Sequence, residues 1–184
     1  HAFLRQDNLS TEEKIKHLHS YIKAKKNPYI FKPYPLSVRI IEWAMFLSKE
    51  GIKDKKIEGA LAHQAKKLEK SLEYHLLGNH LLENSIALVF AAFYFKDEKK
   101  WKKANKVALA EIKEQILSDG AHFELSPMYH QWILGQLLNA YQLLVNNSRF
   151  PDQTELQFAL KDAAAMMLGY LNSIDFSNGD IPLF

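Results

Sequence analysis

Apolar residues recur every three or four positions along almost the whole chain, the spacing that places them on one face of a helix. The segment from 54 to 77 shows this most clearly, and its apolar positions are Ile57, Leu61, Ala65, Leu68 and Leu72. No segment keeps the strict alternation of apolar and polar residues that a half-buried strand requires. The pattern therefore predicts an all-α protein.

Capping residues and chain breakers divide this pattern into about seven helices. The first helix begins with the capping box Ser10-Thr11-Glu12-Glu13 and ends before Asn27-Pro28. The segment 27–35 contains three prolines and is predicted to be an extended connection. The remaining helices are predicted at about 36–50, 54–77, 79–95, 97–117, 126–145 and 152–174.

The helix at 79–95 is apolar on most of its sides, so we expect it to be the central, buried element. Short connections between helices of similar length predict repeated antiparallel helix pairs. No sequence repeat of fixed period is present, which argues against tetratricopeptide or ankyrin arrays. The three-dimensional interpretation is an all-α layer or an incomplete toroid.

Composition narrows the function classes. The 184 residues suit one domain, with 47% hydrophobic and 24% charged residues as in a soluble globular protein. There is no cysteine, which excludes disulfides and thiolate chemistry, and no apolar run approaches the length of a membrane span. The net charge of +3 is too small to identify a partner, and the absence of an arginine-rich arm argues against nucleic acid. The chain starts without Met and stops on an apolar turn, so we expect a fragment of a longer protein.

Two polar clusters, 78–84 and 119–130, lie at predicted helix starts. Asn79 is either a helix N-cap or a neutral amide that donates hydrogen bonds to a substrate carboxylate. Tyr129 is expected near the third position of its helix, after Ser126 as N-cap and Pro127 as first residue. There the positive end of the helix dipole favours phenolate and so helps a base role, although a tyrosine packed at a helix end is the commoner case.

Five further residues are candidates for substrate contact. They are His80, Glu83, Glu124, His130 and Arg39. Each also has an ordinary structural interpretation: a hydrogen-bonded polar residue in a helical core, or, for Arg39, an exposed side chain without a specific contact. His75, Asn79 and Glu83 would share one face only if a helix continued through Gly78, which we do not expect. No metal-site spacing is present.

The clusters resemble the N-terminal helical domain of the heparinase II/III-like polysaccharide lyases, and they are most similar in motif to heparinase III. The matching motifs are Asn79-His80 with Glu83 following, and Asp119-Gly120 followed by Phe-Glu-Leu-Ser-Pro-Met-Tyr-His at 123–130. The segment from Lys32 to Trp43 resembles the family's earlier helix entry, and residues 181–184 resemble the approach to a hinge. The resemblance covers nearly the whole chain.

The resemblance implies that residues 1–184 form a partial (α/α) toroid of a larger lyase, whose following β-sandwich domain this chain lacks. It implies β-elimination on a uronic-acid polysaccharide such as heparan or heparin, in a cleft between the two domains. Asn79 is then expected to neutralise the uronate carboxylate and Tyr129 to act as base and acid. The partner histidines, and a metal seen in some members, are expected in the absent domain, with no cofactor in this chain. The resemblance also favours the bacterial periplasm over the cytoplasm.

Two other interpretations stay open. One is a non-catalytic helical module for carbohydrate binding or assembly in surface-polysaccharide metabolism. The other is an alginate-type lyase of the same architecture, in which His75 or His80 would replace Asn79 as the neutralising group. In either lyase interpretation we expect the chain alone to be inactive, because half of the cleft is absent.

Overall fold

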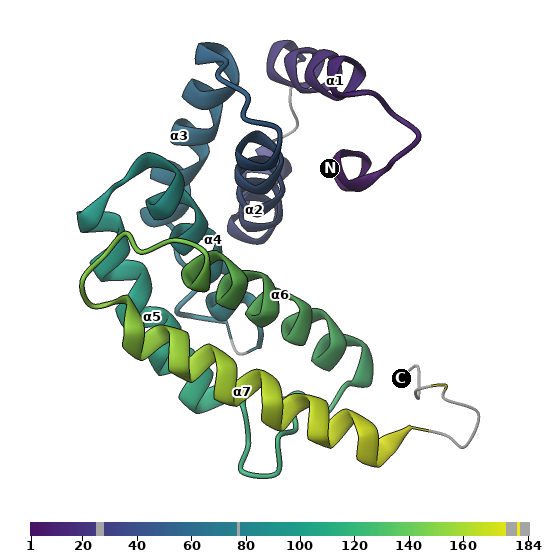
Figure 1. Cartoon of the computed structure of the whole chain (residues 1–184), viewed down its shortest axis with the longest axis vertical. Helices are drawn as coiled ribbons and strands as arrows, with labels where there is room; N and C mark the ends of the chain where they lie inside the picture. Colours follow the sequence, from purple (N-terminus) through teal and green to yellow (C-terminus); the bar gives the residue numbers. More distant parts are fainter. Residues whose placement is uncertain (25–27, 77, 176–179, 181–184) are drawn as a thin grey trace.

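The computed structural model describes residues 1–24, 28–76, 78–175 and 180. These residues form seven α-helices and two short 3-10 helices, drawn in chain order in Figure 1. The elements are η1 (Ala2–Arg5), α1 (Thr11–Lys23), η2 (Pro28–Phe31), α2 (Pro33–Lys49), α3 (Lys55–Glu69), α4 (His80–Phe95), α5 (Glu98–Gln115), α6 (Pro127–Val145) and α7 (Gln153–Ile174). Within the described part there is no strand, only one antiparallel bridge between Ile116 and His122. The all-α prediction is confirmed.

The first helix starts as its sequence predicts. The Ser10 hydroxyl accepts a hydrogen bond from the Glu13 backbone N–H at 3.2 Å, and the Glu13 carboxylate accepts one from the Ser10 N–H at 2.8 Å. This reciprocal capping box satisfies two of the N–H groups that a helix start leaves without partners.

Two predicted boundaries are wrong. The segment expected to be extended contains η2, and α2 begins at Pro33. Proline fits the first helical turn because its missing N–H has no partner there in any helix. The third helix was predicted to reach Leu77, but α3 ends at Glu69, and the buried Leu72 belongs to the connection that follows. Asn27, Leu77 and residues 181–184 lie outside the described residues.

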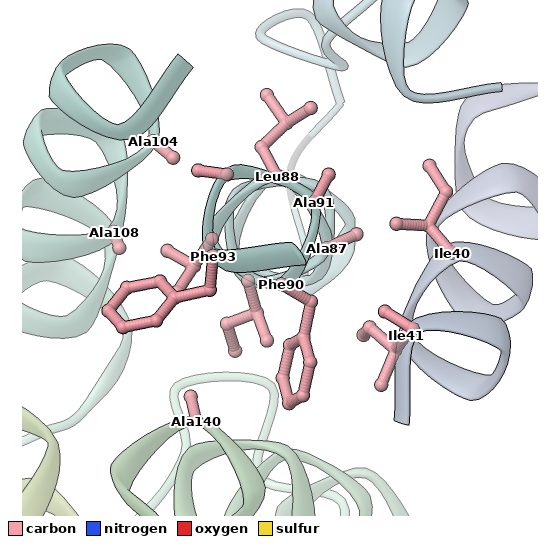
Figure 2. Packing of buried hydrophobic residues seen from close by; sticks show 14 of the residues in the cluster. Ile40, Ile41, Ala87, Leu88, Phe90, Ala91, Phe93, Ala104, Ala108 and Ala140 are labelled. Atoms are coloured by element: carbon pink, nitrogen blue, oxygen red, sulfur yellow. The ribbon is translucent and has the colours of Figure 1, made fainter. Parts of the chain in front are cut away.

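Helix α4 forms the centre of the molecule. Thirteen of its 16 residues are buried, and it packs against α2, α3, α5 and α6. Figure 2 looks along α4 with Ile40 and Ile41 of α2 on one side and Ala104 and Ala108 of α5 on the other. Small alanines at these contacts allow close approach, and each fully buried large apolar side chain contributes about 1.5–3 kcal/mol. The prediction of a central buried helix is confirmed.

Neighbouring helices form hairpins. The pairs α2–α3, α4–α5 and α6–α7 each pack together across a short connection, so each pair is antiparallel. Contacts between early residues of α2, α4 and α6, and a cavity lined by late residues of the same three helices, place their starts at one edge of the molecule and their ends at the opposite edge. Within the described residues, no helix combines the length and apolarity needed to cross a membrane.

Candidate functional site

The first turns of α2, α4 and α6 meet at one edge. The Tyr34 ring, in the first turn of α2, stacks on the His80 ring at the start of α4, with centroids 4.7 Å apart and planes inclined by 26°. The Trp132 indole N–H of α6 donates to Glu83 Oε2 of α4 at 3.2 Å. These contacts bring the two polar clusters of the sequence together. We call the edge formed by Tyr34, Asn79, His80 and Tyr129 the rim.

Asn79 is the N-cap residue of α4, but its side chain does not cap the helix. Its backbone has helical dihedral angles, φ −69° and ψ −7°, instead of the extended conformation usual for a capping side chain, and its side chain forms no cap hydrogen bond. The residue is 5% exposed. Asn79 therefore occupies the N-cap position but does not cap the helix with its side chain, and its amide forms no hydrogen bond with the N–H groups of the first turn.

Tyr129 occupies the third position of α6, as predicted. Pro127 is the first helical residue, and Ser126 precedes it without forming a side-chain cap. Tyr129 is 43% exposed, so its phenol can be reached from outside. The uncapped N–H groups of this turn add positive potential beside the phenol. This combination suits a group that exchanges protons with a bound anionic substrate.

Glu83 lies directly beneath the rim and is completely buried. Burial raises the pKa of its carboxyl group to about 7, partly offset by the hydrogen bond from Trp132. Its Oε1 atom has no hydrogen-bond partner among the described residues. Burial, together with the nearby Glu83 and Tyr129, also raises the pKa of Tyr34 to about 12. Near neutral pH Glu83 therefore holds a proton for a large part of the time, and Tyr34 stays a neutral phenol.

His80 and the connection before α4 are held by a buried polar network. Asn84 accepts a hydrogen bond from the Glu73 N–H at 3.0 Å and donates to Ser37 Oγ at 3.0 Å and to Glu73 Oε2 at 3.2 Å. The same Glu73 oxygen lies 3.4 Å from His80 Nδ1. His75 is exposed in the connection, outside any helix, so the expectation that it shares no helical face with Asn79 is confirmed.

A chain of buried hydrogen bonds connects α7 to the residue before Asn79. His130 Nε2 donates to the Met167 carbonyl oxygen at 2.9 Å, and its Nδ1 accepts from the His122 N–H at 3.2 Å. His122 Nε2 lies 3.1 Å from Gln115 Oε1, and Gln115 Nε2 donates to the Gly78 carbonyl oxygen at 3.2 Å. We call this chain the relay. It fixes the entry to α4 relative to the entry to α6.

Both relay histidines are neutral at ordinary pH. Burial, together with the nearby His130, lowers the pKa of His122 to about 4. Burial also lowers the pKa of His130, against the opposing effect of its bond to the Met167 carbonyl. With Nδ1 as acceptor and Nε2 as donor, each ring has a defined tautomer. The relay therefore positions groups and does not itself carry charge.

Glu124 joins the rim from the loop before α6. A Cβ atom on Gly78 would lie 3.0 Å from Glu124 Oε1, so this partly exposed carboxylate lies against the backbone that leads into Asn79. Gly78 itself has φ +130°, a conformation that side chains rarely tolerate. The backbone conformation therefore favours glycine at this position, whereas the end of the Glu124 side chain is flexible enough to move away. Glu124 remains a candidate for substrate contact.

Three of the candidate residues are buried. Arg39 donates from its guanidinium to Gln64 Oε1 at 2.8 Å and to the Ile30 carbonyl at 2.6 Å, so the expectation of an exposed side chain without a specific contact is wrong. Glu83 and His130 are covered by the protein, and their polar groups bond to Trp132 and within the relay respectively.

Sequence reasoning did not identify Tyr34, Gln115 or Trp132 as part of the site. Tyr34 was assigned to a connection and Trp132 to the core, yet Trp132 is partly exposed. Tyr34 could have been identified from its position just after Pro33, because it lies at a helix start as the two polar clusters do. Among the described residues, no three His, Cys, Asp or Glu side chains are arranged to hold a metal ion.

Comparison with known proteins identifies the family of the chain. The family model "Heparinase II/III N-terminus" matches residues 24–184. The heparin-sulfate lyase of Pedobacter heparinus is 31% identical over 118 residues, which is 62% of this chain and 18% of that protein. The heparin-sulfate lyase of Bacteroides stercoris is 29% identical over 118 residues, 60% of this chain and 17% of that protein.

The fold is also similar to a solved structure. The crystal structure of heparan sulfate lyase HepC from Pedobacter heparinus superposes with a TM-score of 0.59 at 20% identity, over 92% of this chain and 29% of HepC. The chain thus spans less than a third of the length of the relatives it matches. Because the family model covers most of the chain, the chain belongs to the heparinase II/III family, within the N-terminal helical domain of these polysaccharide lyases.

Proposed function

We propose that this chain is part of a lyase that cleaves a uronate-containing polysaccharide of the heparin or heparan sulfate type by β-elimination. The observation that carries the proposal is the convergence of the Asn79 and Tyr129 helix starts at one rim, through the Tyr34–His80 stack and the Trp132–Glu83 hydrogen bond. The names of the two sequence relatives, both heparin-sulfate lyases, support the substrate class.

In this proposal the Asn79 amide and the free N–H groups of α4 hold the uronate carboxylate. Hydrogen bonds to the carboxylate stabilise the enolate-like state that forms when the neighbouring carbon loses its proton. Tyr129, as phenolate, takes the proton from C5. The electron pair of that C–H bond forms the C4=C5 double bond, the C4–O bond breaks, and Tyr129 returns a proton to the leaving oxygen.

The remaining rim residues support these two groups. Because burial raises its pKa to about 7, Glu83 is protonated for a large part of the time near neutral pH, which reduces the carboxylate charge that would oppose the uronate from beneath. The relay keeps the Gly78 carbonyl, and therefore Asn79, in register with the loop that leads to Tyr129. We further propose that a following β-sandwich domain completes the cleft, so that the 184 residues alone do not turn over substrate.

Replacing Tyr129 with phenylalanine in the complete protein tests the proposal. Removing a positioned general base costs about 100-fold to 10,000-fold in rate, so turnover should fall by at least about a hundredfold while thermal unfolding is unchanged. The assay is the absorbance of the unsaturated uronate product on heparan sulfate.

The matched control is Tyr74→Phe, which removes the same hydroxyl from an exposed tyrosine in the connection before α4. This control should keep full activity. Near-normal turnover by Tyr129→Phe would remove Tyr129 from the mechanism. Elimination product formed by the 184-residue chain alone would contradict the requirement for a second domain.

One observation favours an alginate-type alternative. The His80 side chain is 39% exposed, whereas Asn79 is buried, and the buried His80 Nδ1 faces Glu73 Oε2 at 3.4 Å. A partly exposed histidine at the rim can hold a carboxylate in place of the amide. Comparing Asn79→Ala with His80→Ala on heparan sulfate and on alginate separates the alternatives, because only the residue that neutralises the carboxylate should abolish turnover.

A further inference from the structure

A well-formed cavity among the described residues lies at the far end of the same helices. It has a volume of about 410 Å³ and is lined by the C-terminal parts of α2, α4 and α6 and the connections after them. The cavity is lined by α4 residues from Phe90 to Tyr94, so it lies about 15–21 Å along the helix axis from His80 at the rim. This groove is not used in the proposed elimination.

The groove has permanent positive charge. Lys53, Lys96 and Arg149 line it, all three are exposed, and no acidic residue is among its lining residues. Within the described part of the chain, none of the three has a carboxylate within ion-pair distance. The Lys53 ammonium lies 5.6 Å from the centroid of the Tyr94 ring, which forms part of the same wall.

Helix ends reduce this charge without cancelling it. Three helices end here, and each C-terminus carries about half a negative charge. The carbonyl groups at these ends are already partly satisfied, since the Asn146 and Asn147 amides donate to the Gln142 and Leu143 carbonyls at 2.9 and 2.8 Å. Three whole cationic charges therefore exceed three partial negative ones, and the groove attracts anions.

The remaining lining is suited to sugars. Asn139, Gln142 and Ser48 are among the lining residues, together with the partly exposed aromatic residue Tyr94, so the lining contains hydrogen-bonding side chains and an aromatic ring. The volume is at the lower end of the range for ligand pockets. An anionic ligand with ring faces and many hydroxyl groups fits this lining better than a bare ion or an apolar compound.

We propose that this groove is a second glycan-binding site, which holds an acidic oligosaccharide segment away from the point of cleavage. The anionic character of the ligand follows from the lining alone, whereas its identity as a uronate-containing sugar rests on the proposed function. The site binds and does not react. Its effect is to keep long substrate chains attached while the rim acts on them.

The test is a titration of the protein with a heparan sulfate hexasaccharide, with maltohexaose as the neutral control, followed by NMR. The Asn139 and Gln142 side-chain amide signals should shift with the acidic sugar and not with the neutral one. The double variant Lys53→Ala/Arg149→Ala should weaken this binding roughly tenfold, since each partly exposed charge contact is worth up to about a factor of five. Both residues lie outside helices, so the fold should not change.

The matched control is Lys106→Ala/Lys113→Ala, which removes two exposed charges from α5. It should leave the affinity at the groove unchanged. Equal weakening by both double variants would mean unspecific attraction and overturn the proposal, as would unshifted Asn139 and Gln142 amides. If the complete protein forms no elimination product while the groove still binds, the proposed function fails and the groove stands. If elimination proceeds and the groove does not bind, the groove proposal fails and the proposed function stands.

Discussion

The two ends of α4 carry opposite kinds of chemistry. At its start, the rim combines uncharged or titratable side chains with positive helix ends, and the Glu83 carboxyl beneath it has its pKa raised to about 7. At its end, the groove combines permanent cations with negative helix ends. Under our two proposals, the rim transfers a proton and the groove holds a polyanion with charges that pH does not change. The comparison teaches that one buried helix can keep two such sites apart.

The largest expected effect concerns Glu83, which makes the rim sensitive to pH. Its pKa in the folded protein, about 7, lies above the ordinary value of 4.5. The folded state therefore binds a proton there that the unfolded state releases, and stability falls as the pH rises from 4.5 through 7. Glu83→Gln removes the charge and keeps an acceptor for Trp132. Above pH 7 the variant should be more stable by about 3 kcal/mol, and near pH 4.5 the two should be nearly equal.

Urea unfolding between pH 4.5 and 8.5 measures this difference. His122 acts in the opposite direction, because burial lowers its pKa to about 4 and stability rises with pH between about 4 and 6.5. Both proteins contain His122, so its contribution cancels in the difference. A stability difference that is the same at every pH would contradict the buried, titrating carboxyl. Binding at the groove should not vary with pH in the same range.

Gly78→Ala should damage the rim and leave the groove intact. An alanine at φ +130° is strained, and its Cβ would press on the Glu124 carboxylate at 3.0 Å. Strain of this kind costs about 2 kcal/mol, measured as a lower free energy of unfolding, and activity should fall as Asn79 shifts. The groove amides should still respond to the hexasaccharide.

Gly59→Ala is the matched control for this substitution. Gly59 lies inside α3, and no atom is within 4 Å of the added Cβ, so alanine should raise stability by up to about 1 kcal/mol. Loss of groove binding in Gly78→Ala would show that the two ends of α4 are not independent.

The smallest expected effect comes from the relay. Gln115→Met removes the donor to the Gly78 carbonyl and leaves His122 Nε2 without its acceptor, which should lower stability by about 1 kcal/mol. If the relay positions Asn79, kcat of the complete protein should fall more than KM rises. The control is Glu111→Gln, which keeps an acceptor beside Gln115. It should change neither the stability nor kcat. A drop in stability with unchanged kcat would give the relay a purely structural role.

The helices were predictable because their signals are local. The capping box at Ser10, the proline after Ser126 and the glycine at 78 each act within a few residues, and the structure has a helix boundary at each. The apolar spacing at Leu72 misled the prediction of α3, because a loop residue can be buried at the same interval as a helical one. The spacing of apolar residues indicates which residues are buried, and residues outside helices are buried as well.

The candidate site was predictable only in part, because burial of polar residues depends on distant packing. Nothing near Arg39 in the sequence shows that Gln64, 25 residues away, accepts its hydrogen bond. Likewise the partner of His130 is a backbone carbonyl 37 residues further on. Positions at helix starts, such as Asn79 and Tyr129, could be identified because the elements that place them are local. Their roles remain predictions.

The near-complete burial of α4 limits how a protein of this architecture can acquire a new specificity. With 13 of 16 positions inside, almost any substitution along this helix changes packing before it changes recognition. For the proposed lyase, variation that alters which polymer is accepted should therefore accumulate in the connections at the two ends of α4, where substitutions disturb packing less. Libraries that aim to change its substrate should randomise those connections and leave the central helix unchanged.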